Sequence, residues 1–200
     1  MKIESQNIFF CSDLHIGHEN VIKFDNRPFV NLEEMHQKLI ENWNAVIKDE
    51  DLVFYLGDFS FKDRDNAKKF RSQLKGKIHF ILGNHDRYTQ ITELGFKKVY
   101  GDETGLGGAT ISVKDEDAHR GYQDIILCHY PLLIWNKSHY GSWHIHGHCH
   151  QSLQRNKEIN WYYTRKVIDV GINGIEYTPI SYQKVKNIME KRVILTLDHH

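Results

Sequence analysis

The chain has 200 residues, enough for one domain with a sizeable core, so its length excludes a disulfide-stapled miniprotein. Lys and Arg together number 26, as do Asp and Glu, and the resulting net charge of zero excludes a global positive field that would draw the chain onto long duplex nucleic acid or anionic lipid. No apolar run approaches the roughly 20 residues needed to cross a bilayer, so a membrane-spanning protein is not expected either.

Short apolar runs rich in β-branched and aromatic residues recur along the chain and predict strands. Eight such runs lie at residues 7–11, 52–56, 77–82, 96–100, 109–113, 124–128, 143–147 and 166–170.

Helical patterns lie between the early strands and near the end of the chain, at residues 31–47, 65–74 and 181–189. Asn31 is placed to cap the first helix with Glu34 three residues on, and Ser181 is placed to cap the last. The apolar stripe of the first helix comprises Leu32, Met35, Leu39, Trp43 and either Val46 or Ile47.

The first half of the chain thus alternates strand and helix, and the second half is mostly strand, which favours an α/β layer sandwich with a mixed sheet. Because no repeat or linker interrupts the pattern, we predict a single domain over residues 1–198 and interpret His199 and His200 as the remnant of a purification tag. Three widely spaced cysteines and the lack of a signal-peptide pattern predict a cytoplasmic protein.

Polar residues suited to metal binding follow four of the predicted strands, at the carboxyl ends where open α/β sheets bind ligands. These segments are Asp13-Leu14-His15, Gly57-Asp58, Gly83-Asn84-His85-Asp86 and His129, and Gly147-His148-Cys149-His150 is a fifth.

Side chains two residues apart in an extended segment point to the same face, so Asp13 and His15 can bind one ion together, as can His148 and His150. Each motif alone is weak evidence, because a lone histidine at a strand end is more often a hydrogen-bonded structural residue. The five motifs together, in this order, predict a metal site.

The order of these motifs resembles that of the calcineurin-like metallophosphoesterase superfamily, in particular its small stand-alone bacterial or phage-type members, and the tail from Asp169 to Ser181 is similar to the family's usual ending. The resemblance implies a four-layer α-β-β-α sandwich with mixed sheets. It also implies one divalent ion held by Asp13, His15 and His150, a second held by Asn84, His129 and His148, and a bridging role for Asp58.

Two divalent ions about 3.5 to 4 Å apart suit the hydrolysis of phosphate esters, because they share a hydroxide nucleophile and neutralise phosphate oxygens. His85, next to Asn84, is placed to protonate the leaving oxygen, and Asp86 is placed to orient the His85 ring. A turn-capping carboxylate is an equally good interpretation of Asp86.

The ligand set of carboxylate, amide and imidazole suits Mn, Fe, Co, Ni or Zn better than Ca or Mg, and the resemblance favours Mn. The family pattern leaves Cys11, Cys128 and Cys149 unused, and a small buried thiol is the better interpretation of Cys149.

His144 and His146 continue the alternation that leads to His148 and His150. Either these two histidines are further metal ligands or, as we favour, His146 packs behind a ligand and His144 is partly exposed.

Arg27 lies in the loop after the first motif, where its guanidinium group is placed to hydrogen-bond a phosphate oxygen. His18 is placed to contact the same phosphate. A surface ion pair for Arg27 and a structural role for His18 are the alternatives. Further along, residues 106–121 predict a hairpin with a charged tip, and residues 131–141 predict a loop that forms one wall of the cleft.

The sequence therefore predicts an enzyme that hydrolyses a phosphodiester or phosphomonoester, of a small or nucleotide-like substrate, by attack of a metal-bridging hydroxide. A phosphoprotein phosphatase is less favoured because the chain is short. A catalytically weak metal-binding interaction module is less favoured because all seven ligands and His85 are present. The physiological substrate and the oligomeric state are not predicted.

Overall fold

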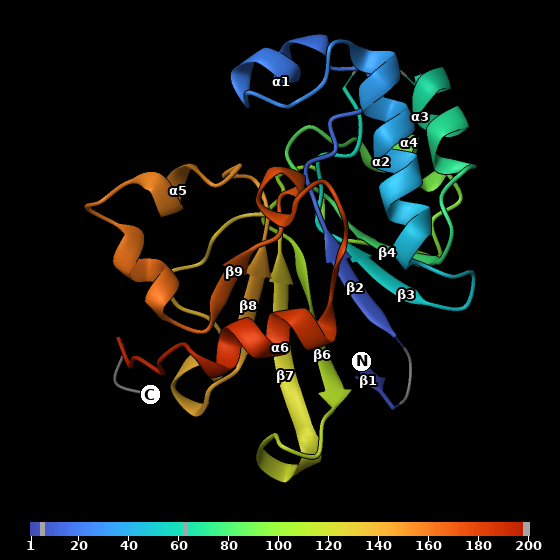
Figure 1. Cartoon of the computed structure of the whole chain (residues 1–200). Coiled ribbons are helices and arrows are strands. Elements are labelled where there is room, and N and C mark those ends of the chain that lie inside the picture. Colours follow the sequence, from blue (N-terminus) through green and yellow to red (C-terminus); the bar gives the residue numbers. More distant parts are fainter. Residues whose placement is uncertain (5–6, 62–63, 198–200) are drawn as a thin grey trace.

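The computed structural model describes residues 1–4, 7–61 and 64–197 and contains two five-stranded mixed sheets (Figure 1). His199 and His200, interpreted above as a tag remnant, lie outside the described residues, as does residue 198 at the predicted end of the domain.

In the first sheet, four parallel strands are flanked by an antiparallel one, β10, which pairs with β2. The order is β10 (Ile180–Ser181), β2 (Ile8–Cys11), β3 (Leu52–Tyr55), β4 (Lys77–Ile81) and β5 (Lys98–Tyr100). In the second sheet only the β6–β7 pair is antiparallel. Its order is β1 (Lys2–Ile3), β6 (Gly108–Lys114), β7 (Tyr122–Cys128), β8 (Trp143–His146) and β9 (Val167–Asp169).

The two sheets pack face to face through an apolar core, because the strand residues alternate between two buried surfaces. In β2, Ile8 and Phe10 contribute to the core between the sheets, whereas Phe9 and Cys11 contribute to the core under the helices. Both faces of this sheet are thus buried, which explains why its strands read as continuous apolar runs.

Helices cover the outer face of the first sheet: α2 (Leu32–Val46), α3 (Arg64–Arg71) and α4 (Tyr88–Thr92) (Figure 1). Helix α1 (Glu19–Phe24) lies beyond the upper end of that sheet, beside the start of α2. Asn31 caps α2 as predicted, since its side chain accepts a hydrogen bond from the Glu34 N–H over 2.9 Å. The apolar stripe ends at Ile47, which is buried, and not at Val46, which is exposed.

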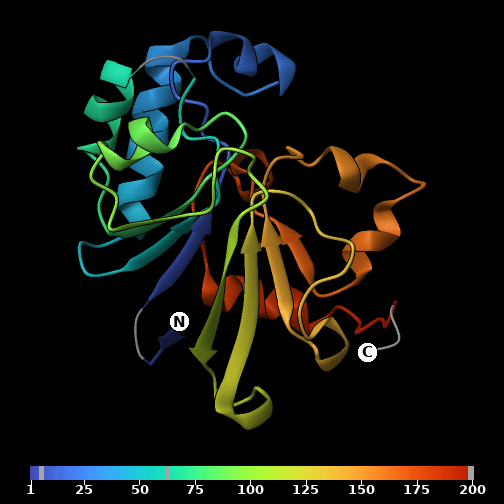
Figure 2. The ribbon, with the colours of Figure 1, turned by 180° about the vertical axis from the view of Figure 1, so that it is seen from behind.

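On the opposite side, α5 (Ser152–Arg155) and short 3₁₀ segments flank the second sheet, as the view from behind shows (Figure 2). These 3₁₀ segments are Ser138–Tyr140 and Asn160–Thr164. Two further 3₁₀ segments lie elsewhere: His119–Gly121 in the turn between β6 and β7, and Ile172–Ile175, whose Ile172 packs into the core under the helices of the first sheet. The last helix, α6 (Tyr182–Glu190), places Val185 and Met189 in the core between the sheets, and Ser181 caps it by accepting from the Lys184 N–H.

The predicted α/β class and layered sandwich are confirmed, and each of the eight predicted strands is present with slightly different ends. The hairpin predicted over residues 106–121 covers only the first strand, β6, and the turn of the observed hairpin. The second strand is β7, which pairs with β6 along seven residue pairs. The helix predicted to reach residue 74 ends at Arg71. The two-residue strands β1 and β10 and the short helices α1, α4 and α5 were not predicted.

Candidate metal centre

The loops that follow β2, β3, β4, β7 and β8 converge at the upper end of the two sheets in Figure 1. They bring six of the predicted ligands into two groups, in each of which the ligand atoms lie within 4.8 Å of one another. The groups are Asp13, His15 and His150, and Asp58, His129 and His148. Each group draws its side chains from both sheets.

In the first group, the Nε2 atoms of His15 and His150 lie 3.1 Å apart, and Nε2 of His150 lies 3.5 Å from Oδ1 of Asp13. Donor atoms bound to one transition-metal ion at about 2.1 Å lie roughly 3.0 to 3.4 Å from each other. The spacing of these atoms therefore fits a shared divalent ion.

The second group includes Asn84 as well, because its Oδ1 atom lies 3.1 Å from Nε2 of His129 and 3.0 Å from Nδ1 of His148. Asp58 lies between the groups: its Oδ2 atom is 3.4 Å from Nε2 of His129 and 3.7 Å from Nε2 of His15. This is the placement that a bridging carboxylate needs.

Five of the seven predicted ligands have a left-handed backbone, with φ of 60° at Asp13, 53° at His15, 57° at Asp58, 70° at His148 and 45° at His150. The extended conformation invoked above to align Asp13 with His15, and His148 with His150, is therefore wrong. Main-chain hydrogen bonds hold the first turn instead, from the Asp13 N–H to the Gly57 carbonyl (3.0 Å) and from the His15 N–H to the Asp58 carbonyl (3.1 Å). Such strained conformations concentrate at functional sites.

Two glycines are required by close packing around these turns. A Cβ on Gly83 would lie 2.4 Å from Oδ1 of Asp58, and a Cβ on Gly147 would lie 2.6 Å from Oδ2 of Asp13. Any larger side chain at either position would displace a predicted ligand.

Hydrogen bonds behind the ligands orient two of the imidazole rings. Nδ1–H of His129 donates to the Leu56 carbonyl over 2.7 Å, and Nδ1–H of His150 donates to Oδ2 of Asp25 over 2.7 Å. In both rings this leaves Nε2 facing the group of ligands. Sequence reasoning missed Asp25, which stands two residues before Arg27 in a loop and matches no metal motif.

Carboxylates raise the basicity of the same two rings in the metal-free protein. Burial lowers the pKa of His150, but hydrogen bonds and charge from Asp13 and Asp25 outweigh burial and raise it to about 10. Burial also lowers the pKa of His129, but the hydrogen bond to Asp58 and the negative charges of Asp58 and Asp13 outweigh burial and raise this pKa to about 9. Both imidazole rings are therefore in the doubly protonated, charged form at neutral pH in the metal-free protein.

His85 lies at the exposed edge of the centre, with its ring centroid 5.7 Å from that of His15. Its main-chain N–H donates to Oδ1 of Asp58 over 3.0 Å, which fixes the position of the residue beside the candidate bridge. The ring is thus close to the ligands without belonging to either group.

Asp86 does not orient the His85 ring as expected. Its buried carboxylate accepts three main-chain N–H groups, from Asp58 (2.7 Å), Phe59 (3.1 Å) and Gly83 (2.9 Å). The turn-capping alternative is therefore the correct one. Burial and the charge of Asp58 raise the pKa of Asp86 to about 7.

Arg27 does not face a substrate either, which corrects the predicted phosphate contact. Its side chain is buried, and its guanidinium donates to the main-chain carbonyls of Asp13 and Leu14, each over 2.9 Å. It also pairs with Asp25 at 3.1 Å. His18, in contrast, is partly exposed, and its ring stacks on Phe61 with centroids 4.3 Å apart.

His144 and His146 are fully buried behind the centre, so the expected partial exposure of His144 is wrong. His144 accepts from the Leu132 N–H at Nε2, and His146 bonds to the Gly147 carbonyl and the Tyr163 hydroxyl. Burial lowers the pKa of His144 to about 4 and that of His146 to about 3, so both rings are neutral and structural.

All three cysteines are free thiols, and neither ligand group contains one. Burial raises the pKa of each, for Cys149 to about 12, which disfavours the thiolate that metal binding requires.

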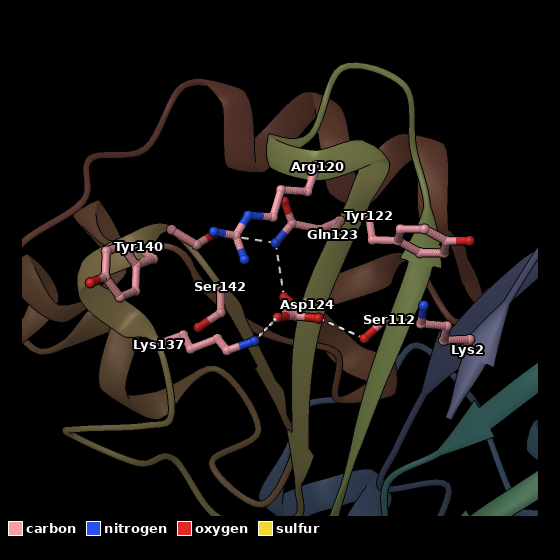
Figure 3. A pocket seen from close by; sticks show the side chains of 10 residues that line it. Lys2, Ser112, Arg120, Tyr122, Gln123, Asp124, Lys137, Tyr140 and Ser142 are labelled. Carbon is pink, nitrogen blue, oxygen red and sulfur yellow. Dashed lines mark hydrogen bonds and ion pairs between the residues drawn. The ribbon is translucent and has the colours of Figure 1, made fainter.

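The loop over residues 131–141 does not form the expected cleft wall along its whole length. Trp135 is buried beneath the guanidinium of Arg165, and Lys137 and Tyr140 reach the opposite end of the second sheet. There they line a hollow with Lys2 and Arg120, in which Lys137 forms an ion pair with Asp124 over 2.7 Å (Figure 3). This hollow is remote from the candidate metal centre, because it lies at the start of β7 and the centre lies beyond its end.

Comparison with known proteins identifies the family of the chain. The family described as calcineurin-like phosphoesterase matches residues 6–177. An uncharacterized protein of Methanocaldococcus jannaschii is 35% identical over 198 residues, covering 96% of this chain and 97% of that protein. The gene 66 protein of Mycobacterium phage L5 is 30% identical over 185 residues, covering 84% of this chain and 87% of that protein.

A crystal structure of a protein of unknown function from Aquifex aeolicus superposes with a TM-score of 0.66 at 24% identity, covering 92% of this chain and 100% of that one. This likeness concerns the fold.

No helix in the described part of the chain is both long and apolar enough to span a membrane.

Proposed function

The chain belongs to the calcineurin-like phosphoesterase family, and on that premise we propose that it is a dinuclear metal-dependent hydrolase of phosphodiesters or phosphomonoesters. The observation that carries the proposal is the pair of ligand groups that share Asp58. A module that binds metal without catalysis would not need His85 beside a complete ligand set.

In this proposal Asp13, His15 and His150 hold one divalent ion, Asn84, His129 and His148 hold the other, and Asp58 contacts both. The donors are two carboxylates, one amide and four imidazoles, a set that fits Mn, Fe, Co, Ni or Zn, of which we propose Mn. When bound, two such ions supply a hydroxide nucleophile and neutralise charge on the phosphate.

His85 supplies the proton for the leaving oxygen. Its exposed ring can approach an ester that the two ligand groups hold, and its main chain is fixed to Asp58. His18 lies on the same side, with its ring centroid 5.8 Å from that of His15, and we assign it a contact with the phosphate or its substituent.

The proposed substrates are small or nucleotide-like phosphate esters. The ligand atoms recognise only phosphate and its metals, and both His85 and Asn84 are exposed, so the centre is open. The three free thiols agree with the predicted cytoplasmic location, which we retain as part of the proposal.

A substrate panel tests the proposal directly. Metal-stripped protein is assayed with bis-p-nitrophenyl phosphate, p-nitrophenyl phosphate, cyclic nucleotides and nucleoside diphosphates, with and without added Mn²⁺. We expect chelation to abolish hydrolysis and Mn²⁺ to restore it better than Mg²⁺ or Ca²⁺. Full activity in rigorously metal-stripped protein would contradict the proposal.

A further inference from the structure

Asp25, at the end of α1, lies between two parts of the candidate metal centre that are far apart in sequence. Its Oδ2 atom accepts a hydrogen bond from Nδ1–H of His150 over 2.7 Å, across 125 residues of chain. The same oxygen accepts from Nη2 and Nε of Arg27 at 3.1 and 3.3 Å. Only 11% of the Asp25 side chain is exposed, so water competes weakly for these contacts.

Arg27 connects this carboxylate to the first motif. Its side chain is fully buried, and its two terminal nitrogens donate to the main-chain carbonyls of Asp13 and Leu14. A continuous path of hydrogen bonds therefore runs from the Asp13–His15 turn through Arg27 and Asp25 to the ring of His150. This path joins the sequence segments that hold all three ligands of the first group.

We propose that Asp25 is a positioning residue, which fixes the ring of His150 so that Nε2 faces Asp13 and His15 and so strengthens ion binding by this group. The inference rests on the proposed function only in requiring that the group binds a divalent ion. Arg27 acts through Asp25, because it holds the carboxylate against the turn that carries the other two ligands.

The second group is supported differently, which makes a selective test available. His129 donates its Nδ1–H to the main-chain carbonyl of Leu56, a neutral acceptor that side-chain substitution leaves in place. A carboxylate behind a ligating imidazole makes that ring a stronger donor to the metal, and losing such a partner typically costs about 10- to 100-fold in metal affinity. Substitution of Asp25 should therefore weaken one ion and spare the other.

The experiment titrates Mn²⁺ into metal-free wild type, Asp25→Ala, Asp25→Asn and Asp49→Asn by calorimetry, with metal content measured after dialysis. Asp49 is an exposed carboxylate before β3 and serves as the matched control. For Asp25→Ala we expect one ion to bind about 10- to 100-fold more weakly and the other at close to wild-type affinity. Asp25→Asn keeps an oxygen acceptor for His150, so its loss should be smaller, and Asp49→Asn should match wild type.

A second readout follows the ring itself. In Zn²⁺-loaded protein, long-range ¹H–¹⁵N spectra should show His150 with a protonated Nδ1 and a metal-bound Nε2 in wild type, and a loss of that state in Asp25→Ala. If circular dichroism shows that Asp25→Ala does not fold, the isosteric Asp25→Asn decides, and we expect it to weaken only one ion.

The possible results separate the two ideas. Two ions bound at wild-type affinity by a folded Asp25 variant would overturn the positioning role and leave the proposed function standing. Equal weakening of both ions would also overturn it, because a selective contact cannot act on both groups alike. If wild type itself binds no Mn²⁺, the proposed function fails first.

Discussion

The carboxylate of Asp86 accepts the main-chain N–H of Asp58 at 2.7 Å and so holds the candidate bridging residue from behind. The same carboxylate holds Phe59 and Gly83, which ties the turn after β3 to the turn after β4. Asp86 thus acts on the centre through the backbone and not through the substrate.

Asp86→Asn should destabilise the fold, because an amide nitrogen cannot accept a hydrogen bond. If the Asn oxygen takes the place of Oδ2, which accepts from Asp58 and Gly83, the Phe59 N–H still loses its acceptor. A buried donor left without a partner costs about 1 to 3 kcal/mol, and we expect a loss of roughly that size in urea unfolding of the metal-free protein. Any loss of activity should be the same for all leaving groups. A variant of wild-type stability that slows only poor leaving groups would restore the catalytic role for Asp86.

His85→Ala should keep two ions bound and lose proton donation, which is typically worth about 10² to 10⁴ in rate. The loss should grow as the pKa of the leaving group rises, so nucleoside or alkyl esters should suffer more than p-nitrophenyl esters. The measurement compares wild-type and variant rates across a leaving-group series at equal metal occupancy. A constant ratio would assign His85 to positioning and transfer the proton to another histidine, with His18 the next candidate.

Asp58→Asn should reduce activity by roughly two orders of magnitude or more and lower the metal content toward one or no ion per chain, because one carboxylate serves both groups. Excess Mn²⁺ should raise the melting temperature of wild type more than that of the variant, since ions stabilise the state that binds them. Elemental analysis that finds two ions in the variant at wild-type affinity would show that Asp58 is not the bridge.

Metal binding should release protons and strengthen as pH rises. His129 and His150, with pKa values raised to about 9 and about 10, are protonated at neutral pH and must lose those protons to bind an ion. Apparent Mn²⁺ affinity should therefore keep rising above pH 7, where an ordinary imidazole is already deprotonated. Calorimetry in buffers of different ionisation enthalpy counts the protons released, and a count of zero at pH 7.5 would contradict the raised pKa values.

The sequence alone predicts those helices and strands that are determined by the pattern of neighbouring residues. Apolar runs predicted the eight longer strands, and Asn31 with its stripe predicted α2, because capping and periodicity are properties of neighbouring residues. The two-residue strands β1 and β10 were missed, since they depend on partners far along the chain. The ligands themselves were recognised from the order of the motifs, and the structure brings them together.

The surroundings of those ligands were less predictable. Arg27 and Asp86 are charged residues beside motifs, and sequence alone does not show whether such a side chain faces a substrate or the backbone. Their partners, Asp13, Leu14, Asp58 and Gly83, are set by tertiary contacts between loops. The left-handed turn at His148 and His150 was hidden for the same reason, because an x-His-x-His pattern reads equally well as a strand.

The origin of each ligand group in both sheets has a kinetic consequence. An ion in either group would join loops from the two sheets, so its departure would require bonds to ligands from both sheets to break together or the two sets of loops to separate locally. Exchange of bound for free metal should therefore be slow compared with diffusion and should track local opening, as amide hydrogen exchange reports it for β2 and β7. The lifetime of the ion is then a property of the packing that holds the two sets of loops together as much as of the ligands.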